Sequence, residues 1–390
     1  MIIRRDIQTV FKRLVKDYPV VTITGPRQSG KTTLARTTFP DIPYFSMEDP
    51  DIRAMALADP RSFLENDASQ VILDEIQRAP QLLSYIQGIV DEPHSVHPRK
   101  FILTGSYQLE MIGKVVQSLA GRTALLRLLP FTFGEVHRFG KKYSVNDFLI
   151  RGFYPRVYRE SLDPTTAYKY YFETYVQRDL RQLITIKDLR LFQKFVRLCA
   201  GRAGRIFVAS SLSNEVGVSV PTIHSWISVL EASSIIFLLE PYHENIGKRL
   251  VKSPKLYFHD VGLASYLLGI ENEKQMERDP ARGGLVENLV VSELVKNRFN
   301  AGKDHNLFFY RDSNNNEVDI IFKTGTMLVP AEVKSAATFT ADFLKGLDYL
   351  KKIFPGRIEK SYLVYCGKQG RQLGNVQLIA IESVREIVDG

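Results

Sequence analysis

A glycine-rich run, Gly25–Thr32, constrains this chain more than any other feature. Its letters, GPRQSGKT, fit the pattern GxxxxGK(S/T) without a mismatch. The apolar residues 20–23 before it predict a strand, and residues 33–36 after it predict the first turn of a helix. Between a strand and a helix, glycines let consecutive backbone N–H groups point at one polyphosphate, which the helix dipole also favours. The run therefore predicts a phosphate-binding loop in an α/β fold.

The pattern assigns roles to the side chains of this loop. Lys31 is expected to reach the β- and γ-phosphates, and the Thr32 hydroxyl is expected to bind Mg²⁺. The expected cofactors are therefore ATP and Mg²⁺. The residues expected to contact the nucleotide are Gly25, Arg27, Gln28, Ser29, Gly30, Lys31, Thr32 and Thr33.

The next pattern that is typical of a buried strand ends in two carboxylates. Residues 70–73 are apolar or neutral, and Asp74 and Glu75 follow them. Downstream of a phosphate loop, this is the Walker B arrangement. We expect Asp74 to hold Mg²⁺ through water, and Glu75 to orient or deprotonate the attacking water.

Two further polar positions follow in the predicted ATPase sheet. Residues 100–103 predict a buried strand that ends in hydroxyl groups, and either Thr104 or Ser106 is the expected sensor of the γ-phosphate. Arg122 ends a predicted helix before a strand over residues 123–128. Two interpretations of Arg122 stay open. It could be an arginine finger acting on the nucleotide of a neighbouring subunit, or a cation that satisfies the last carbonyls of its own helix.

These motifs resemble those of the prokaryotic AAA-type ATPase family whose carboxy-terminal part is a domain of unknown function numbered 4143. Four later segments are similar to that family's signatures, namely Phe131–Glu135, Gly152–Pro155, Tyr175–Asp179 and Lys255–Leu263. The resemblance covers essentially the whole chain. It implies a P-loop AAA+ ATPase core over residues 1–130 and a helical lid over 131–188, in which Arg156 is a candidate sensor.

The lid segment is rich in aromatic residues. Tyrosines 168, 170, 171 and 175 are expected to form a packed helix face. Beyond the lid, a helix stopped by Gly217, a helix over residues 220–231 and a strand over 235–239 predict a winged helix-turn-helix within 189–262. Its second helix would expose Thr222, His224 and Ser225 to DNA or to a protein partner.

A second group of polar residues lies near the end of the chain. Asp319 follows a predicted hairpin turn, and the strand over residues 328–334 places Glu332 and Lys334 on one face. Glu287 opens a predicted helix. The pattern resembles the PD-(D/E)XK nuclease core, a restriction-endonuclease-like α/β domain expected over residues 263–390. Two carboxylates would hold Mg²⁺ and the lysine would activate water. An alternative is a binding or scaffolding domain that keeps this fold without cleaving nucleic acid.

Composition agrees with a globular chain of two or three domains. The chain has 390 residues, a net charge of +9 and two cysteines, and its apolar runs are shorter than the roughly 18–20 residues that span a bilayer. The charge favours a polyanionic partner such as nucleic acid. DNA is expected as the partner rather than RNA. The cysteine pair and the absence of a signal-peptide pattern predict reduced thiols in a cytoplasmic protein with no membrane partner.

The sequence therefore predicts a Mg²⁺-dependent ATPase that acts as a nucleic-acid-associated motor or switch. A homo-oligomer is implied if Arg122 acts in trans. Two alternatives stay open: an ATP-regulated metal-dependent endonuclease, and a slowly hydrolysing assembly switch with protein partners.

Overall fold

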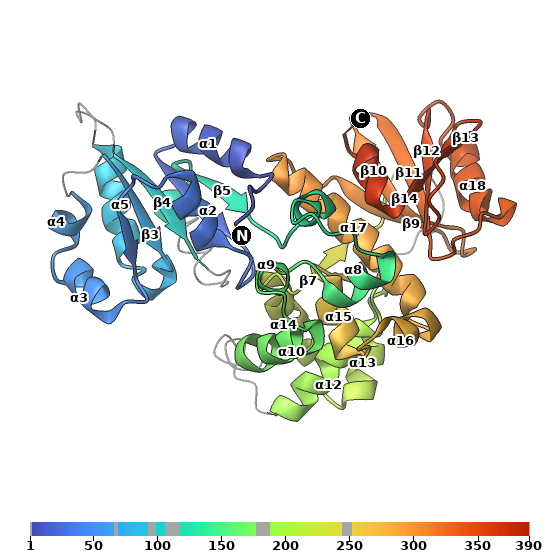
Figure 1. The fold of residues 1–390 in the computed structure, drawn as a ribbon, viewed down its shortest axis with the longest axis horizontal. Helices are drawn as coiled ribbons and strands as arrows, with labels where there is room; N and C mark the ends of the chain where they lie inside the picture. Colours follow the sequence, from blue (N-terminus) through green and yellow to red (C-terminus); the bar gives the residue numbers. More distant parts are fainter. Residues whose placement is uncertain are drawn as a thin grey trace. The chain divides into compact units, whose positions relative to one another are not determined.

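The computed structural model describes residues 2–65, 69–92, 99–105, 118–176, 188–243 and 252–389. They form two compact units (Figure 1). Unit 1 contains Met1–Phe131 with the short segments Ala232–Ser234 and Phe299–Lys303, and unit 2 contains the rest of the chain. Ser106, one of the two predicted sensors, lies outside the described residues. The four predicted domains stay a prediction.

Unit 1 is built on a parallel sheet in the order β2-β3-β4-β1-β5. The strands are β1 (Val20–Thr24), β2 (Tyr44–Ser46), β3 (Gln70–Asp74), β4 (Lys100–Thr104) and β5 (Thr123–Arg127). Successive residues of β3, such as Val71 and Ile72, alternate between two separate cores, as expected when helices cover both faces. The α/β fold with a parallel sheet is therefore as predicted. Because β4 lies between β1 and β3, the carboxyl ends of these three strands lie side by side.

Helices cover both faces of this sheet. On one face lie α1 (Gln8–Asp17) and α2 (Lys31–Thr38). On the other lie α3 (Pro50–Ala58), α4 (Pro60–Leu64), the turn η1 (Ile76–Arg78) and α5 (Leu82–Asp91). Helix α2 follows directly from the glycine-rich loop, so its amino end faces the carboxyl edge of β1.

The first half of unit 2 is mostly helical. Its helices are α7 (Phe133–His137), α8 (Val145–Arg151), α9 (Pro155–Arg159), α10 (Pro164–Tyr171), the π-helical turn η2 (Phe172–Val176), α12 (Leu189–Ala200), α13 (Ala209–Val216), α14 (Val220–Ala232), α15 (Val261–Leu267) and α16 (Glu273–Arg278). A small antiparallel sheet in the order β6-β8-β7 lies among them. Its strands are β6 (Arg205–Ile206), β7 (Ile236–Leu239) and β8 (Lys255–Phe258).

One detail of the predicted tyrosine face is wrong. Tyr168, Tyr171 and Tyr175 are buried and pack against one another or their neighbours, but Tyr170 is 57% exposed. A helical repeat of 3.6 residues explains this, because positions 168, 171 and 175 share a face and position 170 points away from it.

Two of the signature segments meet at a buried carboxylate. Asp260 accepts hydrogen bonds from the Phe153 N–H (2.6 Å), the Leu263 N–H (3.0 Å) and the Tyr168 hydroxyl (2.7 Å). Gly152 lies beside this group with φ +56°, and a Cβ there would be 2.0 Å from the tyrosine oxygen. The glycine of one motif is therefore required by the aspartate of the other, which gives both motifs a structural role.

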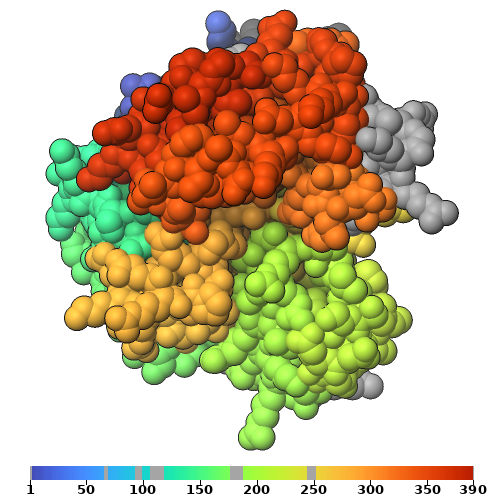
Figure 2. Space-filling model, turned by 90° about the vertical axis from the view of Figure 1, so that its right-hand side faces the viewer, coloured from blue at the N-terminus to red at the C-terminus, as the bar shows by residue number. Residues whose placement is uncertain are grey.

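The second half of unit 2 is a six-stranded mixed sheet in the order β13-β14-β12-β11-β10-β9. Its strands are β9 (Leu307–Arg311), β10 (Glu317–Thr324), β11 (Met327–Lys334), β12 (Ser361–Tyr365), β13 (Arg371–Leu373) and β14 (Val376–Ala380). The elements around it are η3 (Ala341–Leu344), α18 (Lys345–Ile353) and η4 (Ile381–Ile387). In Figure 2 these residues form the orange-to-red mass, and the yellow-green helices of the first half are seen on the same face.

Helix α17 (Arg282–Asn300) is buried along most of its length. It carries charged residues inside unit 2, where Glu293 and Lys296 pair at 2.8 Å with almost no exposure. Its Asn288 side chain exchanges two hydrogen bonds with the backbone of Phe258 in β8. Within the described segments, no helix combines the length and apolarity needed to cross a membrane.

Replacing Gly152 with alanine should destabilise unit 2. The new methyl group would collide with Asp260 and Tyr168, and overpacking of this kind costs roughly 1–3 kcal/mol in addition to the strain of a positive φ. Thermal unfolding monitored by circular dichroism measures the effect.

Gly269→Ala is the matched control for this substitution. Gly269 also has a positive φ, +77°, but a Cβ there would meet nothing within 4 Å. An equal loss of stability in the two variants would show that backbone strain alone matters and that the contact with Asp260 does not.

Candidate functional site

The backbone of the glycine-rich loop has the turns that the sequence predicts. Gly25 has φ +146°, and a Cβ there would lie 2.1 Å from the Leu128 carbonyl oxygen. Gly30 has φ +94° at the start of α2. Both conformations are unfavourable for a residue with a side chain. The two glycines are therefore required, one by close packing and one by its dihedral angle.

Lys31 is folded into this loop and is only 5% exposed. Its ammonium donates hydrogen bonds to the carbonyl oxygens of Gly25 (3.1 Å) and Pro26 (3.0 Å). Burial lowers the pKa of Lys31 to about 8, and the carboxylates of Glu75 and Asp74 oppose that shift. The lysine is therefore charged at neutral pH and lies next to the backbone that would surround a phosphate.

The Asp74 carboxylate is the point where the elements of unit 1 converge. Thr32 Oγ1 donates to its two oxygens at 2.9 and 3.0 Å. The Tyr44 hydroxyl donates to Oδ2 at 2.7 Å, and the Thr104 hydroxyl donates to Oδ1. Burial and this contact raise the pKa of Tyr44 to about 12. Asp74 is thus surrounded by neutral hydroxyl donors from α2, β2 and β4.

The neighbouring Glu75 has an unusual backbone. Its φ is +53°, which is rare for a residue other than glycine and marks functional or strained positions. Its N–H donates weakly to Thr104 Oγ1 at 3.4 Å, and Gln77 Nε2 donates to its carboxylate. Thr104, the predicted sensor that lies within the described residues, is placed beside the acid pair.

Arg5 supports the loop from outside the motif, and the sequence analysis missed it. Its guanidinium donates to the carbonyl oxygens of Ser29 and Leu129, both at 2.8 Å, and lies 4.8 Å above the Phe131 ring centroid. No local pattern around residue 5 indicates this role. The Ser29 hydroxyl is buried and has no hydrogen-bond partner among the described residues.

Arg122 lies away from the loop within its own unit. It precedes β5, which is parallel to β1 with Val20 opposite Thr123, so it lies at the amino edge of the sheet. Its guanidinium binds both carboxylate oxygens of Asp91, at 2.5 and 2.6 Å, and donates to the Ala120 carbonyl. This geometry leaves both interpretations of Arg122 open.

The loop and the acid pair fit ATP and Mg²⁺. The close approach of the Leu128 carbonyl at Gly25 excludes a side chain there, and within the described segments the buried Ser29 hydroxyl has no hydrogen-bond partner. Thr32 and Asp74 offer the hard oxygen ligands that Mg²⁺ prefers. Arg27, Gln28 and Thr33 lie on the same loop and the first turn of α2.

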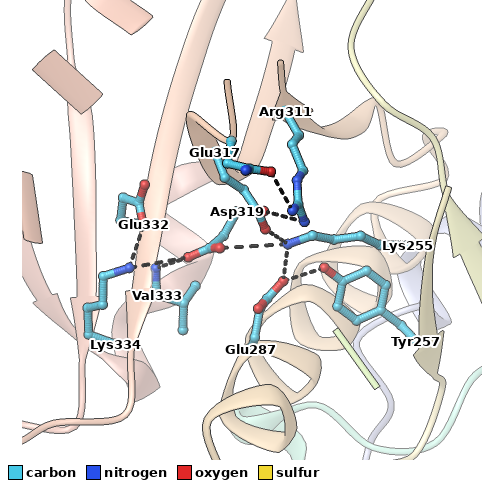
Figure 3. Close-up of polar contacts among 10 residues, drawn as sticks. Lys255, Tyr257, Glu287, Arg311, Glu317, Asp319, Glu332, Val333 and Lys334 are labelled. Carbon is cyan, nitrogen blue, oxygen red and sulfur yellow. Dashed lines mark hydrogen bonds and ion pairs between the residues drawn. The ribbon is translucent and has the colours of Figure 1, made fainter. Parts of the chain in front are cut away.

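The four residues predicted near the end of the chain are brought together in unit 2 (Figure 3). Lys334 pairs with Glu332 at 2.6 Å and lies 3.9 Å from Asp319. The Val333 N–H donates to Asp319 Oδ2 at 2.8 Å. Glu287 approaches from α17. Burial, together with the Asp319 charge, raises the pKa of Glu332 well above its usual range.

A further lysine from the small sheet occupies the same cluster, and the sequence analysis missed it. Lys255 Nζ lies 2.8 Å from Glu287, 2.6 Å from Glu317 and 3.7 Å from Asp319. The Tyr257 hydroxyl donates to Glu287 at 2.6 Å. Burial raises the pKa of Glu287 to about 7, although the nearby lysine opposes the shift. Among the described residues, no group of three or more His, Cys, Asp or Glu has the arrangement of a metal site.

Two mycobacterial proteins are similar to this chain over most of its length. They are the uncharacterized proteins Rv2008c of Mycobacterium tuberculosis and Mb2031c of Mycobacterium bovis. Each is 31% identical over 341 residues, which are 87% of this chain and 75% of the relative. The chain belongs to their family.

Three family models match consecutive parts of the chain. The AAA domain matches residues 17–137, a domain of unknown function (DUF8612) matches 142–274, and a domain of unknown function (DUF4143) matches 282–384. These matches confirm the predicted AAA-type ATPase domain and the carboxy-terminal DUF4143 domain. They support nucleotide binding by the loop. The DUF8612 match was not anticipated.

Solved structures give weaker likenesses. The Walker-type ATPase paby2304 of Pyrococcus abyssi is 13% identical with a TM-score of 0.44, over 68% of this chain and 95% of that one. A variant of RuvB from Thermotoga maritima is 17% identical with a TM-score of 0.31, over 60% of this chain and 89% of that one.

The family matches divide the residues of the carboxy-terminal cluster. Lys255 and Tyr257 lie within the DUF8612 match, whereas Glu287, Asp319 and Lys334 lie within the DUF4143 match. The cluster is therefore shared between two parts of the chain that family comparison treats as separate domains.

Tyr44→Phe should weaken Mg²⁺-dependent nucleotide binding. It removes one hydrogen bond to Asp74, typically worth about 1 kcal/mol, so the Mg²⁺ concentration needed for half-maximal ATP binding should rise roughly fivefold. Titration of a fluorescent ATP analogue at several Mg²⁺ concentrations measures this shift.

Tyr85→Phe is the control, because Tyr85 is 45% exposed on the surface of the same unit. Nucleotide affinity without Mg²⁺ should be unchanged in both variants. An unchanged Mg²⁺ dependence in Tyr44→Phe would contradict the role assigned to the tyrosine.

Proposed function

We propose that this chain is a Mg²⁺-dependent ATPase that converts ATP and water into ADP and phosphate and acts as a nucleic-acid-associated motor or switch. The observation that carries the ATPase proposal is the Asp74 carboxylate, which three neutral hydroxyl groups hold beside Lys31 and Thr32. Neutral donors orient the carboxylate without cancelling its charge, so it can still bind a cation.

In this mechanism each residue has a separate task. Thr32 and Asp74 would hold Mg²⁺, which neutralises charge on the phosphate oxygens when bound. The Lys31 ammonium would leave its carbonyl partners to bind the β- and γ-phosphates. Glu75 would orient the attacking water and accept its proton, and the Thr104 hydroxyl would hold the acid pair in place.

Measured ATP turnover tests this assignment. Lys31→Ala should reduce Mg²⁺-dependent phosphate release to background, since the phosphates lose their main cation. Glu75→Gln keeps the size of the side chain but not its basicity, so it should bind ATP normally and hydrolyse it at least roughly 100-fold more slowly. Full turnover in both variants would exclude the proposed site.

The same assay can show whether Arg122 acts on the nucleotide of a neighbouring subunit. If the arginine acts on a neighbouring subunit, Arg122→Ala mixed with Lys31→Ala should recover activity that neither variant has alone, because each supplies what the other lacks. No recovery would support its local role beside Asp91. We propose a homo-oligomer only if Arg122 acts on a neighbouring subunit.

A nucleic-acid partner is supported by charge rather than by the predicted recognition helix. The chain carries a net charge of +9. The helices α12, α13 and α14 followed by β7 and β8 are consistent with a winged helix-turn-helix, but α14 contains no lysine or arginine. Among the described residues of this region, α12 carries three exposed cations, Arg190, Lys194 and Arg197, which follow a helical spacing. We propose that α12 contacts the phosphate backbone of DNA.

Arg190→Ala/Arg197→Ala should reduce both the affinity for duplex DNA and its salt dependence. Removing two phosphate contacts should lower the slope of log affinity against log salt by about 2. Fluorescence anisotropy at several salt concentrations measures the slope, and Lys351→Ala/Lys352→Ala, which removes two exposed lysines of α18, is the control. An unchanged slope would remove α12 from the proposed interface.

Two alternatives stay distinct from this proposal. A slowly hydrolysing assembly switch would retain nucleotide through purification and change its oligomeric size with the nucleotide bound. An endonuclease would use Glu287, Asp319, Glu332 and Lys334, which lie together in Figure 3. The ammonium of Lys255 in the same cluster is an argument against the endonuclease alternative.

A further inference from the structure

We propose that the carboxy-terminal acid cluster binds the Lys255 ammonium in place of a divalent metal. The cluster would then join the small sheet to the carboxy-terminal sheet and would not be a metal-dependent phosphodiesterase site. This inference is independent of the proposed ATPase activity, because all of its residues lie in unit 2.

Position and burial support this role for Lys255. Its ammonium is within 2.8 Å of Glu287 and Glu317, and its side chain is only 1% exposed. The Phe309 ring covers it, with the centroid 5.4 Å from Nζ. Since a buried ammonium is costly unless it is paired, this lysine cannot leave the carboxylates without finding equivalent partners.

The charge of the cluster leaves little need for a metal. Its carboxylates are those of Glu287, Glu317, Asp319 and Glu332. Its cations are Lys255, Lys334 and Arg311. With every group ionised, the sum is one negative charge. Without Lys255 it would be two, which is the charge that a divalent cation would neutralise. The lysine therefore supplies part of the positive charge that nuclease chemistry would take from a metal.

The geometry around Glu287 supports the same conclusion. Tyr257 donates to the carboxylate oxygen that also binds Lys255, and both residues come from β8. A Cβ on Gly204 would be 3.2 Å from the other oxygen of Glu287. One oxygen of Glu287 is thus bound by two residues of the small sheet, and the Gly204 backbone lies near the other, which leaves less room for a metal at this carboxylate.

Two backbone connections lie beside the lysine and make the cluster a joint. Asn288 exchanges hydrogen bonds with the backbone of Phe258 at 2.6 and 2.9 Å, which fixes β8 against α17. The Tyr242 N–H donates to the Phe309 carbonyl at 2.7 Å, which continues β7 onto β9. The ion pairs therefore act at a place where the two sheets are already aligned.

Manganese binding to the full-length chain tests the proposal. In an electron paramagnetic resonance titration without nucleotide, Lys255→Met should bind one more Mn²⁺ per chain than the wild type, and Lys255→Arg should not. Adding Asp319→Asn to Lys255→Met should abolish the extra site. The proposal fails if the wild type already has a Mn²⁺ site that Asp319→Asn removes, or if folded Lys255→Met gains none.

Thermal unfolding gives a second measure that does not depend on metal. Lys255→Met should lower Tm by several degrees more than Lys323→Met, which removes an exposed lysine from β10. Adding Glu287→Gln should restore part of the loss, because it removes a carboxylate left without its cation. Strictly additive losses would contradict the joint. If Lys255→Met does not fold, Lys255→Met/Glu287→Gln should still fold. Failure of this double variant to fold would also contradict the joint.

Cleavage assays decide between the joint and the endonuclease directly. Plasmid and single-stranded DNA incubated with the wild type and Mg²⁺ or Mn²⁺ should stay intact. Cutting by the wild type that is lost in Asp319→Ala would overturn the proposal. Neither result would change the interpretation of ATP turnover in unit 1.

Discussion

The Asp74 carboxylate is the interaction on which the order of unit 1 depends. Hydroxyl groups of Thr32, Tyr44 and Thr104 reach it from α2, β2 and β4. A buried carboxylate needs such partners, and here they come from positions 30 and 42 residues away in the sequence. The contacts that compensate its charge therefore also fix the phosphate loop against two strands. The hydrogen bonds that the buried Asp74 carboxylate requires thus also link the site to the strands of the sheet.

Three largely buried carboxylates among the described residues have different kinds of donor, and the donor determines what each can still do. Neutral hydroxyls surround Asp74 and leave its charge available to a cation. Backbone N–H groups and a tyrosine bind Asp260, which joins two signature segments. The Lys255 ammonium pairs with Glu287 and cancels its charge. A sequence shows that an acid is present, but only its partners distinguish a metal ligand from a structural joint.

The sequence could predict the parts of the fold and site that depend on local spacing. The strand, loop and helix around Gly25–Thr32 are contiguous, and the two-residue repeat of a strand places Glu332 beside Lys334. The contacts of Arg5, Tyr44 and Lys255 could not be predicted, because each acts on residues from distant elements. Lys255 opens a signature segment, but that segment does not indicate which carboxylates the lysine binds. Tyrosine 170 shows the opposite error, in which composition suggested a packed face that helical periodicity does not allow.

The boundary between the DUF8612 and DUF4143 matches runs through an electrostatic network. Lys255 and Tyr257 lie before it, and the carboxylates that they bind lie after it. Cutting the chain there would leave Glu287 without the Lys255 ammonium, and removing one partner of a buried ion pair is strongly destabilising. In this chain most of both matched segments lies in one compact unit, where these ion pairs connect them. The boundary between two family matches can therefore lie between residues that form ion pairs with each other in the folded protein.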